Sequence, residues 1–406
     1  MRVLLLNQTF YPDVAASAQY LKDLALGLIE RGHQVTDVAS QRAYDDPGIR
    51  FSKRDNWRGV EIHRIAASGL GKGAKWKRAL DFGSFLTACA LKLVSLPRHD
   101  VVVALTSPPL ISFLGAALAQ MRGSKFVYWV LDLNPDEAIQ AGWLEAGSLG
   151  ARSLESISRY SFRRADRIIA LDRFMAARIQ AKGISSDKIE VIPPWSHDDV
   201  VRFDAEGRDK FRAKHGLTEK FVVMYSGNHS PCHPLNTLLE AARKLSKDSR
   251  FVFCFIGGGS EFGKVKDFAV KNSLPNIVCL PYQPLNELSG SLSAADVHVV
   301  VMGDPFVGTI HPCKIYNILS VAAPILYIGP SPSHVTEVLG ALTDRDAFAT
   351  VEHGAVEKVI FHLHKLSCLG RRGNDRGYAE LAAAFSRDRW LRQFVNTLER
   401  VHRSAL

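Results

Sequence analysis

Short apolar runs of strand length alternate with longer segments of helical periodicity along the whole chain. This alternation predicts an α/β protein in which helices cover parallel sheets. A helix with Leu21, Leu24 and Leu28 on one face follows the first run. The first series of expected strands comprises Val3–Leu6, Val35–Val38, Val60–Ile65, Val101–Leu105, Phe126–Leu131, Arg167–Ala170 and Ile189–Ile192.

The pattern restarts after Pro193–Ser196 and a polar stretch, which predicts a second domain. We therefore expect two doubly wound, Rossmann-like domains, residues 1–200 and 201–385, that face each other across a cleft. Ligands of such sheets bind beyond the carboxyl ends of the strands. The second series of expected strands comprises Phe221–Tyr225, Phe251–Ile256, Ile277–Leu280, Val297–Val301 and Ile325–Ile328.

Composition narrows the class of protein. With 406 residues, 47% hydrophobic and 23% charged, the chain is typical of globular proteins, and collagen-like, coiled-coil and disordered classes are excluded. The six cysteines have no paired spacing, which indicates a reduced, cytoplasmic protein without structural zinc. The first apolar run is too short for a signal peptide. Prolines interrupt the two longest uncharged windows, so we expect no membrane span.

The net charge of +10 is unevenly distributed. Residues 51–100 contain ten Lys or Arg but only four Asp or Glu. Several of these basic residues form a cluster, which is followed by a stretch that contains Phe and Leu. Such a cluster suits an anionic membrane surface. The alternative is a solvated face that leads into a buried helix. No nucleic-acid module accompanies the charge, so we expect no nucleic-acid partner. The cluster consists of Lys72, Lys75, Trp76, Lys77 and Arg78.

Two expected strand-to-helix turns are rich in glycine or histidine. Backbone N–H groups at such turns bind anions, so both are candidate diphosphate contacts; ordinary tight turns are the alternative. The second turn matches neither a P-loop nor a dinucleotide fingerprint, since Val265 stands where a P-loop has Ser or Thr. The candidate residues are Gly227, Asn228, His229 and His233 in the first turn, and Gly257, Gly258 and Gly259 in the second.

Two charged residues are candidates for chemistry. Lys314 is the one charge between Asp304 and Glu337, and Pro312 before it suits a first helical turn, so we expect a phosphate contact rather than a solvated lysine. Asp132 follows an expected buried strand, where polar groups that act on substrates gather. The acids at 136–137 fit either such a role or the start of the next helix.

The order of these motifs resembles that of the retaining family-four glycosyltransferases of the GT-B fold. The closest likeness is to the subgroup that builds bacterial surface polysaccharides, such as lipopolysaccharide and exopolysaccharide, on a lipid carrier. The resemblance covers nearly the whole chain and implies that residues 386–406 form a helix that returns to the first domain. It rests on Phe10–Asp13, Leu24–Ala25, Arg31–Val35, Asp132–Pro135, Ala165–Asp166, Val191–Pro194, Ala294–Asp296 and Pro312–Lys314.

The chain departs from this family at its charged positions. In the first loop, Ala15 and Ala16 or nearby residues stand where the family has a pair of glycines. The family's phosphate-binding Arg and Lys fall on Asn228 and His233, and its two glutamates fall on Thr309 and Asn317. The resemblance implies that the positive charge has moved to Lys314. It also places His311 among the donor-binding residues, and leaves Asn317 to hydrogen-bond the ribose through its amide.

The resemblance implies an enzyme that transfers a hexosyl or N-acetylhexosaminyl group with retention. The second domain would bind a nucleotide diphosphate sugar, UDP-linked by analogy, without a metal cofactor. The first domain would bind a polyprenyl-diphosphate-linked acceptor at the inner face of the cell membrane. Lys314, His233 and turn amides would stabilise the departing diphosphate, and Asp132 would face the sugar or the acceptor. The alternatives are an epimerase or hydrolase on the same fold, and a non-catalytic sugar-nucleotide binder.

Overall fold

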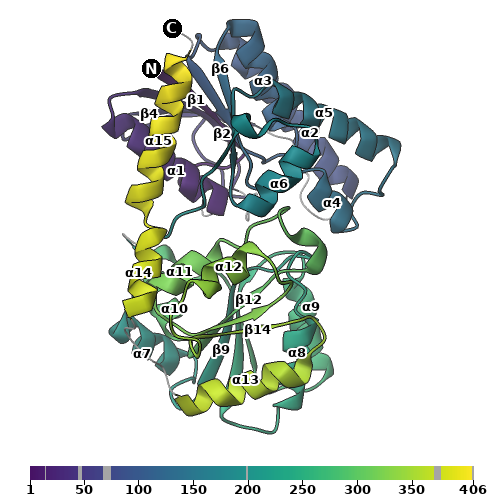
Figure 1. The fold of residues 1–406 in the computed structure, drawn as a ribbon, viewed down its shortest axis with the longest axis vertical. Coiled ribbons are helices and arrows are strands. Elements are labelled where there is room, and N and C mark those ends of the chain that lie inside the picture. Colours follow the sequence, from purple (N-terminus) through teal and green to yellow (C-terminus); the bar gives the residue numbers. More distant parts are fainter. Residues whose placement is uncertain (14, 44–47, 67–74, 198–199, 370–375, 405–406) are drawn as a thin grey trace. The chain divides into compact units, whose positions relative to one another are not determined.

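The chain forms two compact units in the computed structural model, and each unit is a mainly parallel sheet with helices on both faces (Figure 1). The first unit comprises Met1–Pro193, Gly308–Ile310 and Trp390–Leu406, and the second comprises Pro194–Val307 and His311–Arg389. The structure describes all residues except 14, 44–47, 67–74, 198–199, 370–375 and 405–406, and no side chain of residues 75–79 and 376. The expected α/β class with two doubly wound sheets is confirmed.

The first unit has an eight-stranded sheet in the order β3-β4-β2-β1-β5-β6-β7-β8. The chain runs outward from β1 through β2 to β4 and then returns to the other side of β1 as β5. This reversal creates a switch point between β1 and β5, where loops diverge and leave room for a ligand. The strands are β1 (Arg2–Leu6), β2 (Gln34–Ser40), β3 (Arg54–Trp57), β4 (Val60–Ile65), β5 (Val101–Ala104), β6 (Lys125–Trp129), β7 (Arg167–Ala170) and β8 (Ile189–Val191).

The helices of this unit cover apolar strands that are almost fully buried, as expected for a parallel sheet. They are α1 (Ala16–Glu30), α2 (Lys75–Ser95), α3 (Ile111–Arg122), α4 (Asp136–Gln140), α5 (Leu149–Arg164) and α6 (Arg173–Ala181). The last helix, α15 (Arg387–Arg403), packs on the first unit from Trp390 onward, where Phe394 meets Trp129 edge to face with ring centroids 4.5 Å apart. The expected returning helix is therefore confirmed.

The second unit has a six-stranded sheet in the order β11-β10-β9-β12-β13-β14. Its switch point lies between β9 and β12, because the chain runs outward through β10 to β11 before β12 pairs with β9. The strands are β9 (Phe221–Asn228), β10 (Phe251–Gly258), β11 (Ile277–Leu280), β12 (Val297–Val301), β13 (Ile325–Ile328) and β14 (Phe348–Val351).

Helices on both faces of the second sheet bury its apolar side chains. No helix in the described part of either unit is long and apolar enough to cross a bilayer. The helices of the second unit are α7 (Ala205–Lys214), α8 (Asn236–Lys244), α9 (Phe262–Lys271), α10 (Leu288–Ser293), α11 (Lys314–Ser320), α12 (His334–Gly340), α13 (Val356–Leu369) and α14 (Arg376–Ala384).

The two strands that the pattern missed are both edge strands. Residues 54–57 are polar and mostly exposed, and β3 pairs antiparallel with β4. Residues 348–351 are only half-buried, and β14 borders β13 alone. An edge strand that buries little apolar surface has no strong hydrophobic pattern to predict it.

In each unit, the Asp of an Ala-Asp motif hydrogen-bonds to the backbone of a neighbouring strand. The Asp296 carboxylate accepts from the Val222 N–H at 2.7 Å and pairs with the buried Arg212. In the same way, the Asp166 carboxylate accepts from the Phe126 N–H at 2.9 Å and from the Lys125 Nζ at 3.0 Å. Both aspartates thus tie a strand to its neighbour, so this part of the family resemblance has a structural cause.

Candidate functional site

The two glycine turns lie side by side at the carboxyl ends of β9 and β10. Gly227 pairs with Gly257 in the strand register, and their φ angles are +136° and +134°. A side chain on Gly257 would collide with the backbone oxygen of Gly227, and one on Gly259 (φ +116°) would collide with Asn228 and His229. Glycine is therefore required for this close backbone packing. The fold brings the two predicted diphosphate turns together at one edge of the second sheet.

Lys314 begins α11 and directs its ammonium group to the first of these turns. A β-carbon added to Gly227 would lie 3.1 Å from the Lys314 Nζ, so the lysine fills the space that the glycine leaves open. The residue is half-buried, yet its Nζ is shielded from solvent and has no hydrogen-bond partner among the described residues. This burial lowers the pKa of Lys314 to about 7. An unpaired buried ammonium at a glycine turn is suited to receive an anion.

The two histidines of the first turn are held by backbone carbonyls. The Nδ1 of His229 lies 3.0 Å from the Gly227 oxygen, and the Nδ1 of His233 lies 2.7 Å from the Val301 oxygen. Burial, followed by the nearby Lys314, lowers the pKa of His229 to about 4 and that of His233 to about 3. Both rings are therefore neutral at pH 7 and use their single N–H on a carbonyl. A role for His233 in donor binding stays a prediction.

Tyr225 is the residue of this region to which sequence reasoning assigned no role. Its buried ring lies under the Lys314 ammonium, with the Nζ 3.5 Å from the ring centroid. Its hydroxyl donates to the Asn228 carbonyl at 2.8 Å. The available signal was the strand alternation, because residues 225 and 227 project from the same face of β9.

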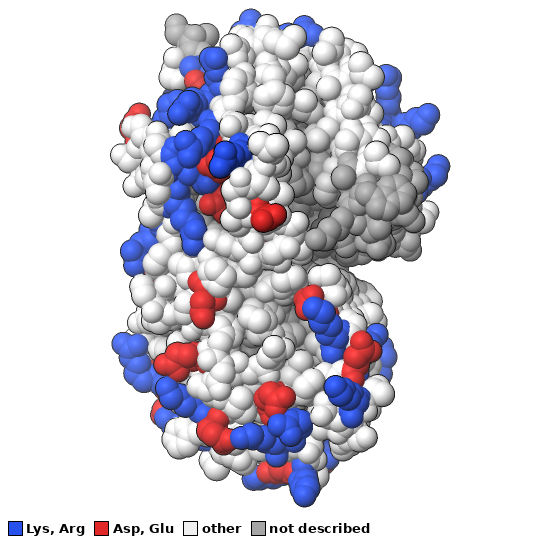
Figure 2. Space-filling view, turned by 90° about the vertical axis from the view of Figure 1, so that its right-hand side faces the viewer, with Lys and Arg blue, Asp and Glu red and all other residues white. Residues whose placement is uncertain are grey.

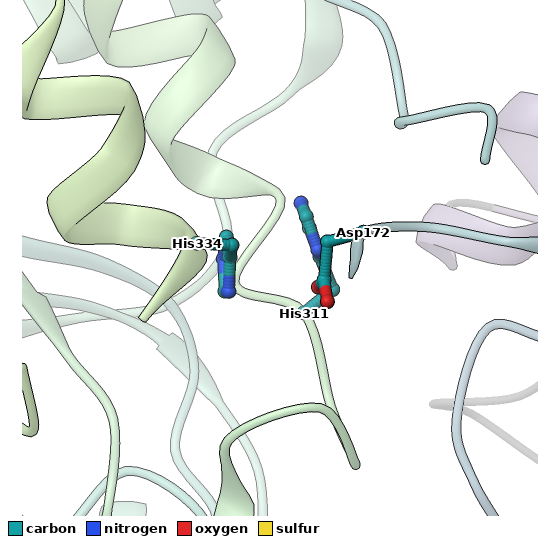
Figure 3. Close-up of side chains that lie close together, drawn as sticks. All are labelled: Asp172, His311 and His334. Carbon is teal, nitrogen blue, oxygen red and sulfur yellow. The ribbon is translucent and has the colours of Figure 1, made fainter. Parts of the chain in front are cut away.

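Two further predicted donor residues, His311 and Asn317, make contacts within the second unit. The ring of His311 stacks on that of His334 with centroids 3.8 Å apart, and its Nε2 lies 2.7 Å from the Tyr316 hydroxyl (Figure 3). The Asn317 side-chain oxygen accepts from the His197 N–H at 3.3 Å. The third side chain in Figure 3, Asp172, belongs to the first unit, where it caps α6. A role for His311 and Asn317 in donor binding stays a prediction.

Asp132 lies in the first unit, in the loop that follows β6. It is half-buried, and burial raises its pKa to about 6. The N–H of the next residue, Leu133, donates to the Thr309 carbonyl at 2.8 Å. Thr309 therefore packs with this loop, and its hydroxyl is buried without a partner in the described part of the chain. Asp136 and Glu137 begin α4, so the helix-start interpretation of these acids fits the structure.

The predicted acceptor and membrane residues lie at the amino ends of two helices in the first unit. Ala15 precedes α1, where its N–H donates to the Asp13 carboxylate at 3.2 Å, and Ala16 begins the helix. Lys72 lies outside the described residues. Lys75, Trp76, Lys77 and Arg78 form the first turn of α2, but their side chains are among those not described.

A basic pocket on α5 was not anticipated from the sequence. Arginines at 159, 163 and 164 line it together with Ser156 and Tyr160. Figure 2 shows Lys and Arg gathered on the first unit beside a broad area without charge. Exposed apolar side chains of the same unit include Leu149 at the start of α5, Met121 in α3, and Leu91 and Val94 in α2. The spacing of the arginines along one helix was the signal in the sequence.

Comparisons with known proteins agree with this architecture. Residues 16–195 match the family described as glycosyl transferase 4-like domain. The chain is 27% identical over 260 residues to a protein of Pseudomonas aeruginosa named "Probable glycosyltransferase WbjE". That match spans 64% of this chain and 64% of the relative.

Solved structures share the fold at low sequence identity. Sucrose-phosphate synthase from Thermosynechococcus elongatus superposes with a TM-score of 0.77 at 12% identity, over 100% of both chains. HepE from Anabaena, solved with UDP and glucose, superposes with a TM-score of 0.72 at 13% identity, over 98% of this chain and 99% of the HepE chain. WaaG, a glycosyltransferase involved in lipopolysaccharide biosynthesis, superposes with a TM-score of 0.67 at 15% identity, over 95% of both chains. The GT-B fold expected from the motifs is thus confirmed by the solved structures, and residues 16–195 match the glycosyl transferase 4-like domain.

Proposed function

We propose that this protein is a retaining glycosyltransferase that moves a sugar from a UDP-sugar to a lipid-linked saccharide during surface polysaccharide synthesis. The relative WbjE is named a probable glycosyltransferase, HepE was solved with UDP and with UDP-glucose, and WaaG is involved in lipopolysaccharide biosynthesis. The observation that carries the proposal is the buried, unpaired Lys314 ammonium beside the Gly227 turn.

The second unit would bind the nucleotide diphosphate at its switch point. The turn that ends β9 lies there, and His233 reaches the end of β12 from the same turn. Lys314 supplies the positive charge, while the glycine turns allow the diphosphate to approach the backbone closely. A cation that is already aimed at the leaving group stabilises the charge that develops there without further reorganisation.

The reaction breaks the bond between the sugar carbon and the diphosphate oxygen and forms a bond from that carbon to an acceptor hydroxyl oxygen. In the proposed retaining transfer, both events occur on the same face of the sugar. The departing phosphate oxygen takes the proton of the acceptor hydroxyl, so no separate base is needed. Lys314 then holds the diphosphate dianion, and Asp132 orients a hydroxyl of the sugar or of the acceptor through its carboxylate.

The first unit would bind a polyprenyl-diphosphate-linked acceptor at the inner face of the cell membrane. The arginines of α5 and the basic first turn of α2 are complementary in charge to anionic lipid headgroups. Exposed side chains such as Leu91 and Met121 add apolar contact. Binding of this kind is peripheral, because it places side chains in the headgroup region without crossing the bilayer.

Transfer of labelled sugar into a lipid extract tests the proposal. UDP-glucose, UDP-galactose and UDP-N-acetylglucosamine are offered in turn, and the anomeric configuration of the lipid product is read by NMR. We expect one donor to label lipid with retained configuration. Donor consumption without labelled lipid would instead indicate a hydrolase or epimerase. Tight UDP binding without consumption of any donor would indicate a non-catalytic binder.

A further inference from the structure

We propose that Tyr225 is a positioning residue for Lys314, and that its ring takes the place of a carboxylate partner in holding the ammonium beside the Gly227 turn. The inference rests on the proposed role of Lys314 as the diphosphate-binding cation. The ammonium lies 3.5 Å from the Tyr225 ring centroid, which is well within the range of a cation–π contact.

No acidic group competes for this ammonium in the described structure. Lys314 forms no salt bridge or hydrogen bond with any described residue. The titratable groups that face it are His229 and His233 from the β9 turn, Cys313 before it in the chain, and Tyr225 itself. Both histidines are neutral at pH 7, because burial lowers the pKa of each. The quadrupole of the ring is therefore the main attraction on the cation before a ligand arrives.

A ring has an advantage over a carboxylate at this position. A carboxylate would form an ion pair that an incoming diphosphate would have to break, and its own charge would repel the phosphate oxygens. The uncharged ring attracts the ammonium without such repulsion. Contact with the ring also restricts the lysine side chain before an anion arrives. Less side-chain entropy is therefore lost when the anion binds.

The ring itself is fixed from two sides. Tyr225 is fully buried in β9, opposite Phe255 of β10, and its hydroxyl donates to the Asn228 carbonyl in the glycine turn. Burial raises the pKa of Tyr225 well above its usual value, so the hydroxyl stays protonated and keeps this hydrogen bond. The ring thus links the lysine and the turn in one geometry.

Variants that keep or remove the ring test this inference. Tyr225→Phe retains the ring, whereas Tyr225→Leu and Tyr225→Met remove it but remain apolar. Phe255→Leu is the matched control, because it removes a buried ring from the facing strand. We expect Tyr225→Phe and Phe255→Leu to bind UDP within about threefold of the wild type, and both ring-less variants to bind at least tenfold more weakly.

A second readout does not depend on UDP. The ¹³Cε resonance of Lys314, assigned by its loss in Lys314→Arg, is followed through a pH titration of the free protein. Without the ring, the ammonium loses its attraction, so its titration midpoint falls in whichever ring-less variant folds and stays in place in Tyr225→Phe. An unchanged midpoint with unchanged UDP affinity in the ring-less variants would overturn the inference. If the wild type binds no UDP but the midpoint still falls, the positioning role stands and the proposed function fails.

Discussion

At the scale of single residues, the central feature is a lysine whose charge is sensitive to pH. Burial without a counter-ion lowers the pKa of Lys314 to about 7, whereas burial raises that of Asp132 to about 6. The two histidines beside the lysine have pKa values of about 4 and 3 and do not titrate near neutrality. Asp132 and Lys314 are therefore an acid and a base whose charges change near neutral pH.

This arrangement predicts a bell-shaped pH profile of kcat/KM for sugar transfer. The rate should fall below about pH 6 as Asp132 gains a proton, and above about pH 7 as Lys314 loses one. In Lys314→Arg, the alkaline limb should disappear, because a guanidinium stays charged throughout this range. An alkaline limb that persists at the same pH in Lys314→Arg would assign it to another group.

The main residues of the candidate site could be predicted from the sequence, but their contacts with one another could not. Motif spacing predicts the glycine turns and an uncharged neighbourhood predicts Lys314, and the fold places the lysine beside the first turn. The strand alternation places Tyr225 and Gly227 on one face of β9, but the contact of this ring with the Lys314 ammonium depends on how the segment that carries Lys314 packs in the folded chain. The backbone partners of the two histidines could not be predicted either, because they depend on tertiary contacts.

At the scale of elements, the apolar runs predicted every buried strand, because a strand covered on both faces must be continuously hydrophobic. The edge strands β3 and β14 bury little apolar surface and left no such signal. The Ala-Asp motifs that supported the family resemblance are explained by strand pairing. They tie β12 to β9 and β7 to β6 through Asp296 and Asp166.

The two aspartates should differ in their contribution to stability. The side chains of Asp296 and Arg212 are 12% and 6% exposed, so Asp296→Ala leaves a buried guanidinium unpaired and should cost about 3 to 5 kcal/mol. Those of Asp166 and Lys125 are 33% and 24% exposed, so the matched Asp166→Ala should cost about 1 kcal/mol. Chemical denaturation of each variant gives the comparison. Equal losses would show that burial of the pair does not set its contribution.

At the scale of the whole molecule, the two units carry different chemistry. The second unit holds the glycine turns and the lysine. The first holds nearly all the residues that match the glycosyl transferase 4-like domain, together with the basic first turn of α2 and the arginine pocket of α5. This division predicts that membrane affinity belongs to the first unit and nucleotide affinity to the second.

Vesicle binding tests the membrane half of this division. Each arginine near an anionic surface contributes about 1 kcal/mol, so Arg163→Ala/Arg164→Ala should bind phosphatidylglycerol vesicles about 30-fold more weakly than the wild type. Lys358→Ala/Lys365→Ala removes the same charge from α13 of the second unit and serves as the control. Similar losses in both variants would indicate a general effect of net charge rather than a docking surface.

Calorimetric titration of the full chain with UDP tests the central claim most directly. We predict saturable binding to one site, at least tenfold weaker in Lys314→Met because a charge-assisted contact to the diphosphate is lost. Lys358→Met, which removes an exposed lysine of the same unit, should bind as the wild type does. Absence of UDP binding by the folded wild type, or equal affinity in Lys314→Met, would contradict the account.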